Sequence, residues 1–375
     1  MMHLLRRPYH HPRAVACARL LHSSPPKKSS FGMAFDIDGV LVRGEGVLPG
    51  ARESLKALED ARIPYVFVTN GGVSDICCTE EAKARDLTSK LGVQVHRSMV
   101  VLSHSPMRAL APEYSGKRVM VLGSSAKKIA EEDLGLLDTV TPEEFAGEWP
   151  DIFHFTGDGY YIPRNFPRRL AEGERPRSVS AVMVLHDPLD WALEAQVVVD
   201  VLRGGEPPGS GGASQTPMYI SNPDFVFASM YQEPRFAAGA FADTVRMLYA
   251  KRFATGEPTI EVFGKPTIST FDYAKRLLEE RHGVIRLQQQ HKATSKIERI
   301  YMVGDNPSGD IRGANAAGPP WISNLVKTGV YRDTGDRGND AEDPAHFVHD
   351  GVRQCVDFAM ERETLGVDEY RGDEA

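Results

Sequence analysis

The chain has 375 residues, of which 41% are hydrophobic and 25% are charged, the balance of a soluble globular protein. Its 51 acidic residues outnumber the 44 basic ones, which argues against a sequence-independent nucleic-acid binder. No uninterrupted apolar run approaches the roughly 18–20 residues that a transmembrane helix needs, so no integral membrane segment is predicted. The length favours two domains, or one domain with a large insertion.

The first 35 residues differ in charge from the rest of the chain. They contain no Asp or Glu, but six basic residues and several serines. This composition is typical of a mitochondrial transit peptide, and the other interpretation is a disordered tail that lacks acids. We expect residues 1–30 to be a transit peptide or disordered. The mature chain should then begin between Leu21 and Phe31 and lie in the mitochondrial matrix.

The four cysteines are too few and too scattered for a disulfide framework, which favours a reducing compartment. They also lack the paired spacing of a zinc site. Cys77 and Cys78 are adjacent, as in some redox sensors. The small residues around them favour the start of a helix instead.

Short apolar runs alternate with amphipathic segments along the rest of the chain. Strands are predicted at residues 32–37, 64–69, 117–122, 180–185, 218–220, 259–263 and 299–303. Helices are predicted at residues 50–61, 80–91, 125–133, 191–202, 239–253, 269–281 and 347–360. This alternation is typical of an α/β fold with a parallel sheet. Residues 204–215 have the Gly, Pro and Ser content of a linker or hinge, and residues 366–375 read as an acidic tail.

Four polar clusters each follow a predicted strand. Because the reactive site of an open parallel sheet lies at the carboxyl ends of its strands, we expect their side chains to meet. These side chains are Asp36, Asp38, Thr69, Asn70, Lys265, Asp305 and Asp310.

The expected site has the groups that phosphoryl transfer needs. Carboxylates gathered this closely repel one another, so we expect a hard divalent cation among them, and Mg²⁺ suits oxygen ligands. A lysine can bind phosphate as a point charge, and the Thr69 hydroxyl with the N–H groups after it can hold phosphoryl oxygens. One carboxylate can attack phosphorus to give an acyl phosphate. A second can protonate the leaving alkoxide and then activate water.

Each cluster alone also has an ordinary structural interpretation. Asp-x-Asp, Gly-Lys-Pro and Thr-Asn-Gly-Gly are common in turns, and Gly-Asp-Asn-Pro is a good helix start. The functional interpretation depends on all four clusters occurring in this order, each after an apolar strand.

The segments DIDGV, VTNGG, FGKPT and VGDNPSGDIRGA resemble, in this order, the four motifs of the haloacid dehalogenase-like hydrolase superfamily. The long separation of Asn70 and Lys265 resembles the branch with an α/β cap between the second and third motifs. That branch is subfamily IIA, the NagD and p-nitrophenyl phosphatase-like proteins. The segments SHSP, HDPLDW, SNPD and PRFAAGAF resemble the mitochondrial cat eye syndrome critical region protein 5-like group within it. The resemblance covers roughly residues 31–360.

The resemblance implies a role for each motif residue. Asp36 matches the nucleophile and Asp38 the general acid/base, whose presence favours phosphate esters over carbon–halogen bonds. The Asp36 side chain, the Asp38 carbonyl and Asp305 would bind Mg²⁺. Thr69, Asn70 and Lys265 would bind phosphate, and Asp310 would support the metal waters or Lys265. Val40 stands where many members carry Thr, a variation that is common in this branch.

The resemblance also implies an architecture and an activity. The expected fold is α/β, with a Rossmannoid parallel-sheet core at residues 31–74 and 216–365 and an inserted cap at residues 75–215. The expected function is Mg²⁺-dependent hydrolysis of a small phosphorylated metabolite through an aspartyl-phosphate. Caps of this branch often dimerise, so a homodimer is an expectation, although the sequence leaves the oligomeric state open. The alternatives are phosphotransfer to another acceptor, a role in phospholipid head-group metabolism, or a non-catalytic mitochondrial binding protein.

Asp187 and Trp191 follow a strand of the predicted cap and have two interpretations. Both could touch the substrate. We favour the other interpretation, in which Asp187 caps a following helix and Trp191 packs beneath it.

Overall fold

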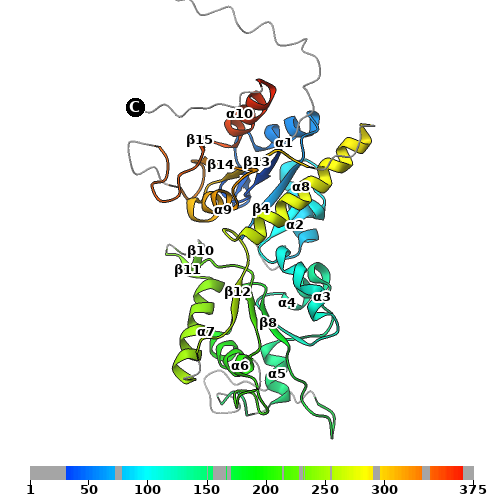
Figure 1. The fold of residues 1–375 in the computed structure, drawn as a ribbon, viewed down its shortest axis with the longest axis vertical. Helices are drawn as coiled ribbons and strands as arrows, with labels where there is room; N and C mark the ends of the chain where they lie inside the picture. The colour runs from blue at the N-terminus through cyan, green and yellow to red at the C-terminus, as the bar shows by residue number, and fades with distance from the viewer. Residues whose placement is uncertain are drawn as a thin grey trace, which may run out of the picture.

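The computed structural model describes residues 31–71, 78–149, 151–154, 166, 170–212, 215–227, 231, 233–253, 256–289, 296–331 and 338–365. The predicted transit peptide at 1–30, the acidic tail at 366–375 and Cys77 lie outside these residues. Two separate parallel sheets with flanking helices make up the fold (Figure 1).

The strands are β1 Phe31–Phe35, β2 Val42–Arg43, β3 Gly46–Val47, β4 Tyr65–Thr69, β5 Val100–Leu102, β6 Val119–Leu122, β7 Thr139–Val140, β8 Ala181–Val184, β9 Met218–Ile220, β10 Val226–Phe227, β11 Arg235–Phe236, β12 Ile260–Val262, β13 Arg299–Gly304, β14 Trp321–Val326 and β15 Phe347–His349. The α-helices are α1 Ala51–Asp60, α2 Glu80–Leu91, α3 Ala111–Tyr114, α4 Ala126–Ile129, α5 Pro142–Glu148, α6 Trp191–Arg203, α7 Ala238–Arg252, α8 Ile268–Gln288, α9 Arg312–Ala317 and α10 Val352–Leu365. Four further helical turns are η1 Arg97–Met99, η2 Ser105–Leu110, η3 Ala130–Leu134 and η4 Pro307–Ile311.

The first sheet has six strands in the order β15-β14-β13-β1-β4-β5, all parallel. Side chains alternate between its faces, so Met33 and Phe35 pack toward α1, α2 and α10, whereas Ala34 packs toward α8 and α9. Both faces are therefore buried, which explains the near-continuous apolar runs of β1 and β4. We call this sheet with its helices the core unit.

The second sheet has five parallel strands in the order β12-β9-β8-β6-β7. One face packs on α5, α6 and α7 and the other on α3 and α4. Local signals start its helices: Thr141 and Glu144 form a capping box on α5, and the Asp190 side chain accepts a hydrogen bond from the Leu193 N–H of α6. We call this sheet with its helices the cap unit.

Sheet membership does not follow the predicted boundaries at residues 75 and 215. Strand β5 and helix α2 belong to the core unit, although they were expected in the cap. Strands β9 and β12 belong to the cap sheet, although they were expected in the core. The chain therefore leaves the core after β5 and returns at Gly264, directly after β12. The Gly- and Pro-rich stretch after α6 connects two elements of the cap and folds into turns in which Gly209 and Gly211 both donate to the Gly204 carbonyl.

Several elements differ from the sequence prediction. The segment predicted as one helix at 347–360 forms β15 followed by α10, because residues 347–349 pair with β14. Strands β5 and β14 and the hairpins β2–β3 and β10–β11 were not predicted. In the described ranges, no helix is both long and apolar enough to cross a bilayer.

Candidate active site

Asp36 and Asp38 lie directly after the central strand β1. The Asp36 N–H donates to the Val303 carbonyl of β13 at 2.9 Å, which continues the sheet register by one residue. Asp36 is buried, whereas Asp38 is exposed in the loop that leads into the β2–β3 hairpin. The two carboxylates therefore stand at the carboxyl edge of the core sheet in different environments, one enclosed and one open.

Lys265, from the polar cluster after β12, contacts Asp36 of the cluster after β1. Its ammonium donates to the Asp36 carboxylate at 2.7 Å, to the Asp310 carboxylate at 2.6 Å and to the Val68 carbonyl at 3.0 Å. Burial would lower the pKa of this lysine, but the charges of Asp310 and Asp36 outweigh that effect and hold its pKa above the usual range. Lys265 is therefore a buried cation with all three donors engaged at the carboxyl ends of β1 and β4.

Asn70 holds the backbone of Lys265 with both ends of its amide. Its Nδ2 donates to the Lys265 carbonyl and its Oδ1 accepts from the Lys265 N–H, each at 2.7 Å. Thr69 is buried beside it, and its hydroxyl accepts from the Gly71 N–H at 3.3 Å. The second cluster therefore fixes the lysine loop across a sequence separation of 195 residues.

Asp305 and Asp310 come from the turn after β13. The Val330 N–H donates to Asp305 at 2.6 Å, and the Asn306 N–H donates to Asp310 at 3.1 Å. A Cβ atom at Gly39 or at Gly329 would overlap the Asp305 carboxylate. Glycine at both positions therefore leaves the space that this carboxylate occupies.

Asp36, Asp305 and Asp310 form a buried carboxylate cluster. One carboxylate oxygen from each lies within 4.8 Å of the others. Burial and the charges of Asp36 and Asp310 raise the pKa of Asp305. Lys265 balances only one of the three charges, so the cluster retains excess negative charge that a divalent cation would neutralise. The all-oxygen donor set fits a hard cation such as Mg²⁺ or Ca²⁺.

Asp224 is a site residue that the sequence analysis missed. It follows β9 of the cap, and the Asn70 side chain hydrogen-bonds to its carboxylate. Burial raises its pKa, while Lys265 and Asn70 act in the opposite direction. The segment SNPD was noted only for its resemblance, although its position after a predicted strand was the same signal that identified the other clusters.

Asp187 and Trp191 both make structural contacts, but the prediction that Asp187 caps the helix directly after it was wrong. The Asp187 carboxylate accepts from the Ala238 N–H at the start of α7 at 2.7 Å, so it caps α7. Asp190, not Asp187, caps α6. The Trp191 ring packs on Phe241 and Phe236, and its Nε1 donates to the Pro188 carbonyl at 3.0 Å.

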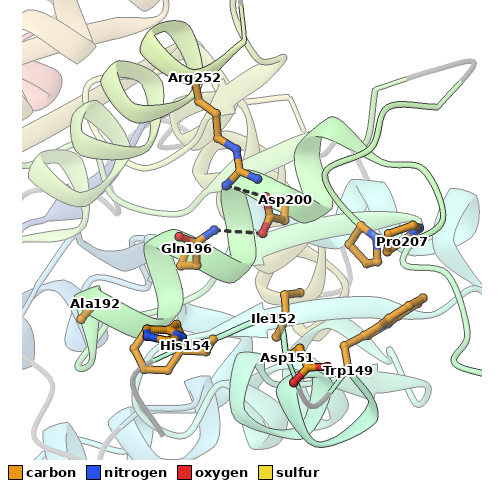
Figure 2. A pocket seen from close by; sticks show the side chains of 11 residues that line it. Trp149, Asp151, Ile152, His154, Ala192, Gln196, Asp200, Pro207 and Arg252 are labelled. Atoms are coloured by element: carbon orange, nitrogen blue, oxygen red, sulfur yellow. Dashed lines mark hydrogen bonds and ion pairs between the residues drawn. The ribbon is translucent and has the colours of Figure 1, made fainter. Parts of the chain in front are cut away.

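A cavity of about 540 Å³ lies in the cap unit, away from these carboxylates (Figure 2). Asp200 on α6 lies at its wall, where Arg252 pairs with it at 3.0 Å and Gln196 donates to it at 2.9 Å. Trp149 and His154 also line it. The cavity contains none of the residues of the four clusters.

Two family models match separate parts of the chain. The model described as haloacid dehalogenase-like hydrolase matches residues 33–136, and a HAD-hydrolase-like model matches residues 262–355. The second match begins in β12, just before Lys265. Together, the matches contain all seven residues of the four clusters.

Two proteins of known sequence are similar over most of the chain. The mitochondrial hydrolase YKR070W of Saccharomyces cerevisiae is 35% identical over 83% of this chain and 90% of its own. A cardiolipin synthase (CMP-forming) / mitochondrial hydrolase fusion protein of Schizosaccharomyces pombe is 32% identical over 88% of this chain. The chain spans 53% of that fusion protein.

The fold is similar to that of solved phosphatase structures. The p-nitrophenyl phosphatase of Archaeoglobus fulgidus superposes with a TM-score of 0.57 over 87% of this chain and 98% of its own. The identity is 18%, so this likeness concerns the fold. It covers both the core unit and the cap unit.

Proposed function

The chain belongs to the haloacid dehalogenase-like hydrolases of the NagD and p-nitrophenyl phosphatase branch, and from that premise we propose that it hydrolyses phosphate monoesters through an aspartyl-phosphate on Asp36. The observation that carries this proposal is the ion pair between Lys265 and Asp36, with a Nζ–Oδ1 distance of 2.7 Å. This contact places a cation directly against the buried carboxylate of Asp36, and a carboxylate is a group that can attack phosphorus.

Hydrolysis takes place in two steps, and Asp36 and Asp38 act in both. In the first, the Asp36 carboxylate forms a bond to phosphorus as the ester oxygen departs, and Asp38 donates a proton to that oxygen. In the second, Asp38 takes a proton from water, which attacks the acyl phosphate and regenerates Asp36. The exposure of Asp38 supports this role, because an exposed carboxylate can exchange a proton with a leaving group and with water.

The remaining residues bind and orient. The Thr69 hydroxyl and the N–H groups after it would hold phosphoryl oxygens, and Lys265, whose three donors are engaged with Asp36, Asp310 and Val68, would attract the phosphate through its positive charge. Asp310 and Asn70 keep Lys265 in place through its side chain and its backbone. Mg²⁺ would be held by Asp36, Asp305 and the Asp38 carbonyl, where it would supply charge neutralisation for the phosphoryl group.

We place the protein in the mitochondrion. The acid-free basic segment at residues 1–30 and the two relatives named as mitochondrial hydrolases support this location. The matrix and the predicted homodimer stay predictions.

A role in phospholipid head-group metabolism is the second candidate function. One observation favours it: a relative of this chain is fused to a cardiolipin synthase. Phosphotransfer to an acceptor other than water uses the same residues. A non-catalytic binding protein explains the seven clustered residues least well, because binding alone does not require an unbalanced carboxylate cluster.

A leaving-group comparison tests the proposed division of roles. Asp38→Asn should lower kcat/KM on an alkyl phosphate by about 10²–10⁴-fold, because alkoxides leave poorly without a proton. The same change should cost much less in phosphoenzyme formation from p-nitrophenyl phosphate, whose leaving group needs no proton. Equal losses on both substrates, measured by single-turnover kinetics, would show that Asp38 is not the acid.

A further inference from the structure

The carboxyl edge of the cap sheet faces the catalytic carboxylates. Strand β12 ends three residues before Lys265, whose ammonium contacts Asp36. The neighbouring strand β9 ends before Asp224, which contacts Asn70. The loops after β9 and β8 therefore border the entrance through which a leaving group must pass.

These two loops present apolar side chains to solvent. Leu189, in the loop after β8, is 78% exposed, and Phe225 and Phe236, in the segment after β9, are 53% and 65% exposed. The rings form a continuous contact, because Phe236 lies 5.7 Å from Phe225 and 6.2 Å from Trp191, measured between centroids. We call Leu189, Trp191, Phe225 and Phe236 the apolar rim.

The rim begins beside the catalytic residues and extends away from them. Phe225 directly follows Asp224, and Val226 and Phe227 of β10 continue the exposed apolar surface. In Figure 1 the hairpin of β10 and β11 lies at the level between α9 of the core and α7 of the cap. An exposed patch of this kind marks a binding surface, because water contact with apolar side chains is unfavourable.

The core unit also has an exposed apolar side chain beside the carboxylate cluster. Val330 is 66% exposed, and its N–H donates to Asp305 at 2.6 Å. Exposed apolar side chains thus stand near the catalytic carboxylates on both the core unit and the cap unit. A protein partner that covered them would block access to the carboxylates, whereas part of a substrate could contact them during turnover.

We infer that the apolar rim binds an aliphatic chain of the leaving group, so that the preferred substrate is a phosphate monoester that carries an alkyl or acyl chain. This inference rests on the proposed function and names its substrate class. The rim side chains form an open strip rather than a closed pocket, which suits a flexible chain that extends out of the entrance. The phosphate would lie at Lys265 and the chain along Phe225 and Leu189.

Alkylphosphonates test this inference without turnover, because their carbon–phosphorus bond is not hydrolysed by this chemistry. With Mg²⁺ present, calorimetry on the ethyl, butyl, hexyl and octyl compounds should show Kd falling about twofold per methylene. Full burial of a methylene gives roughly a fourfold change, and an open strip should give less. A Kd that does not depend on chain length would overturn the inference.

Matched serine substitutions assign the chain dependence to the rim. Leu189→Ser and Phe225→Ser should each flatten the dependence of Kd on chain length. Leu137→Ser is the control, because Leu137 is 81% exposed but precedes β7 at the amino edge of the same sheet. The control should keep the wild-type dependence, and an equal effect of all three changes would contradict a specific role of the rim.

Two further measurements separate the other outcomes. If the rim instead joins two copies, the wild-type protein should sediment as a dimer that Leu189→Ser and Phe225→Ser dissociate, which would overturn the inference. Hydrolysis of glycerol 3-phosphate and of its octanoyl ester tests the proposed function. Hydrolysis of both compounds at equal kcat/KM would reject the role of the apolar rim in chain binding but leave the proposed function standing. The absence of any hydrolysis would reject the proposed function and the substrate class together.

Discussion

Asp305 shows how closely single residues determine this site. Its carboxylate accepts from the Val330 N–H and lies where a Cβ of Gly39 or Gly329 would stand. Gly39 also has a φ of 84°, a left-handed conformation that favours glycine. The position of the carboxylate therefore depends on two glycines from loops after different strands, β1 and β14.

A methyl group at Gly329 should displace the Asp305 carboxylate. We expect Gly329→Ala to lower kcat by about 100-fold, because a shift of about 1 Å in a catalytic group has an effect of that order. The Mg²⁺ concentration for half-maximal activity should also rise. Gly351→Ala is the matched control, since its Cβ would meet only the Thr328 methyl at 3.6 Å. Steady-state kinetics over a range of Mg²⁺ concentrations would check both, and equal activity of the two variants would contradict the expectation.

The residues of the four clusters could be predicted because each stands at the end of an apolar strand. Their contacts could not be predicted in detail. The sequence suggested phosphate binding for Asn70, but its amide is also the clamp on the Lys265 backbone. Asp224 was missed because the segment SNPD was noted only for its resemblance, although it follows a predicted strand as the other clusters do.

At the scale of elements, a buried charge network holds helix α2 against the segment after β5, where the chain first passes from the core unit to the cap unit. Glu80 at its start accepts from Arg108 at 2.8 Å, from Arg97 at 3.1 Å and from Ser105 at 2.8 Å. The Glu80 N–H donates to the buried Asp133 of η3 at 3.0 Å. The network joins α2 of the core to η3 of the cap and fixes this crossing in place.

Removal of the Glu80 charge should destabilise the protein, because two arginines would lose their shared partner. Glu80→Gln should cost about 2 kcal/mol and lower Tm by several degrees. Glu81→Gln on the same helix is the control, since Glu81 is half-exposed and pairs with Arg85 only at 3.8 Å. Differential scanning calorimetry would measure both, and equal Tm values for the two variants would contradict a supporting role of the network.

The elements that were predicted correctly have strong local periodicity. The elements that were missed are short or depend on distant partners. Strand β5 has three residues, and its strand identity comes from pairing with β4. Strand β15 precedes a helix so closely that its residues extend the helical pattern, and only pairing with β14 makes them a strand.

At the scale of the whole molecule, two parallel sheets present their carboxyl edges to one site. Lys265 lies in the loop after β12, the last strand of the cap sheet, and contacts the first carboxylate of the core. The unit boundary at residue 215 was mispredicted because composition marked residues 204–215 as a linker. A linker composition identifies a loop, but strand pairing decides which sheet the loop connects.

The first residues of the chain should direct it to mitochondria. A fluorescent protein that carries residues 1–35 should accumulate there, because the segment has six basic and no acidic residues. Changing the six basic residues to glutamine should abolish the accumulation. Uniform cytosolic fluorescence of the unmodified fusion, seen by microscopy, would refute the targeting without affecting the enzymatic proposal.

The central claim, that Asp36 carries the phosphoryl group, is tested most directly by trapping it. The protein is mixed with p-nitrophenyl phosphate and Mg²⁺, quenched in acid within one turnover, and digested for mass spectrometry. We predict a phosphoryl adduct on Asp36 that forms faster than phosphate is released and that is absent in Asp36→Asn. A folded Asp36→Asn protein that still turns over, or an adduct on another residue, would contradict the account.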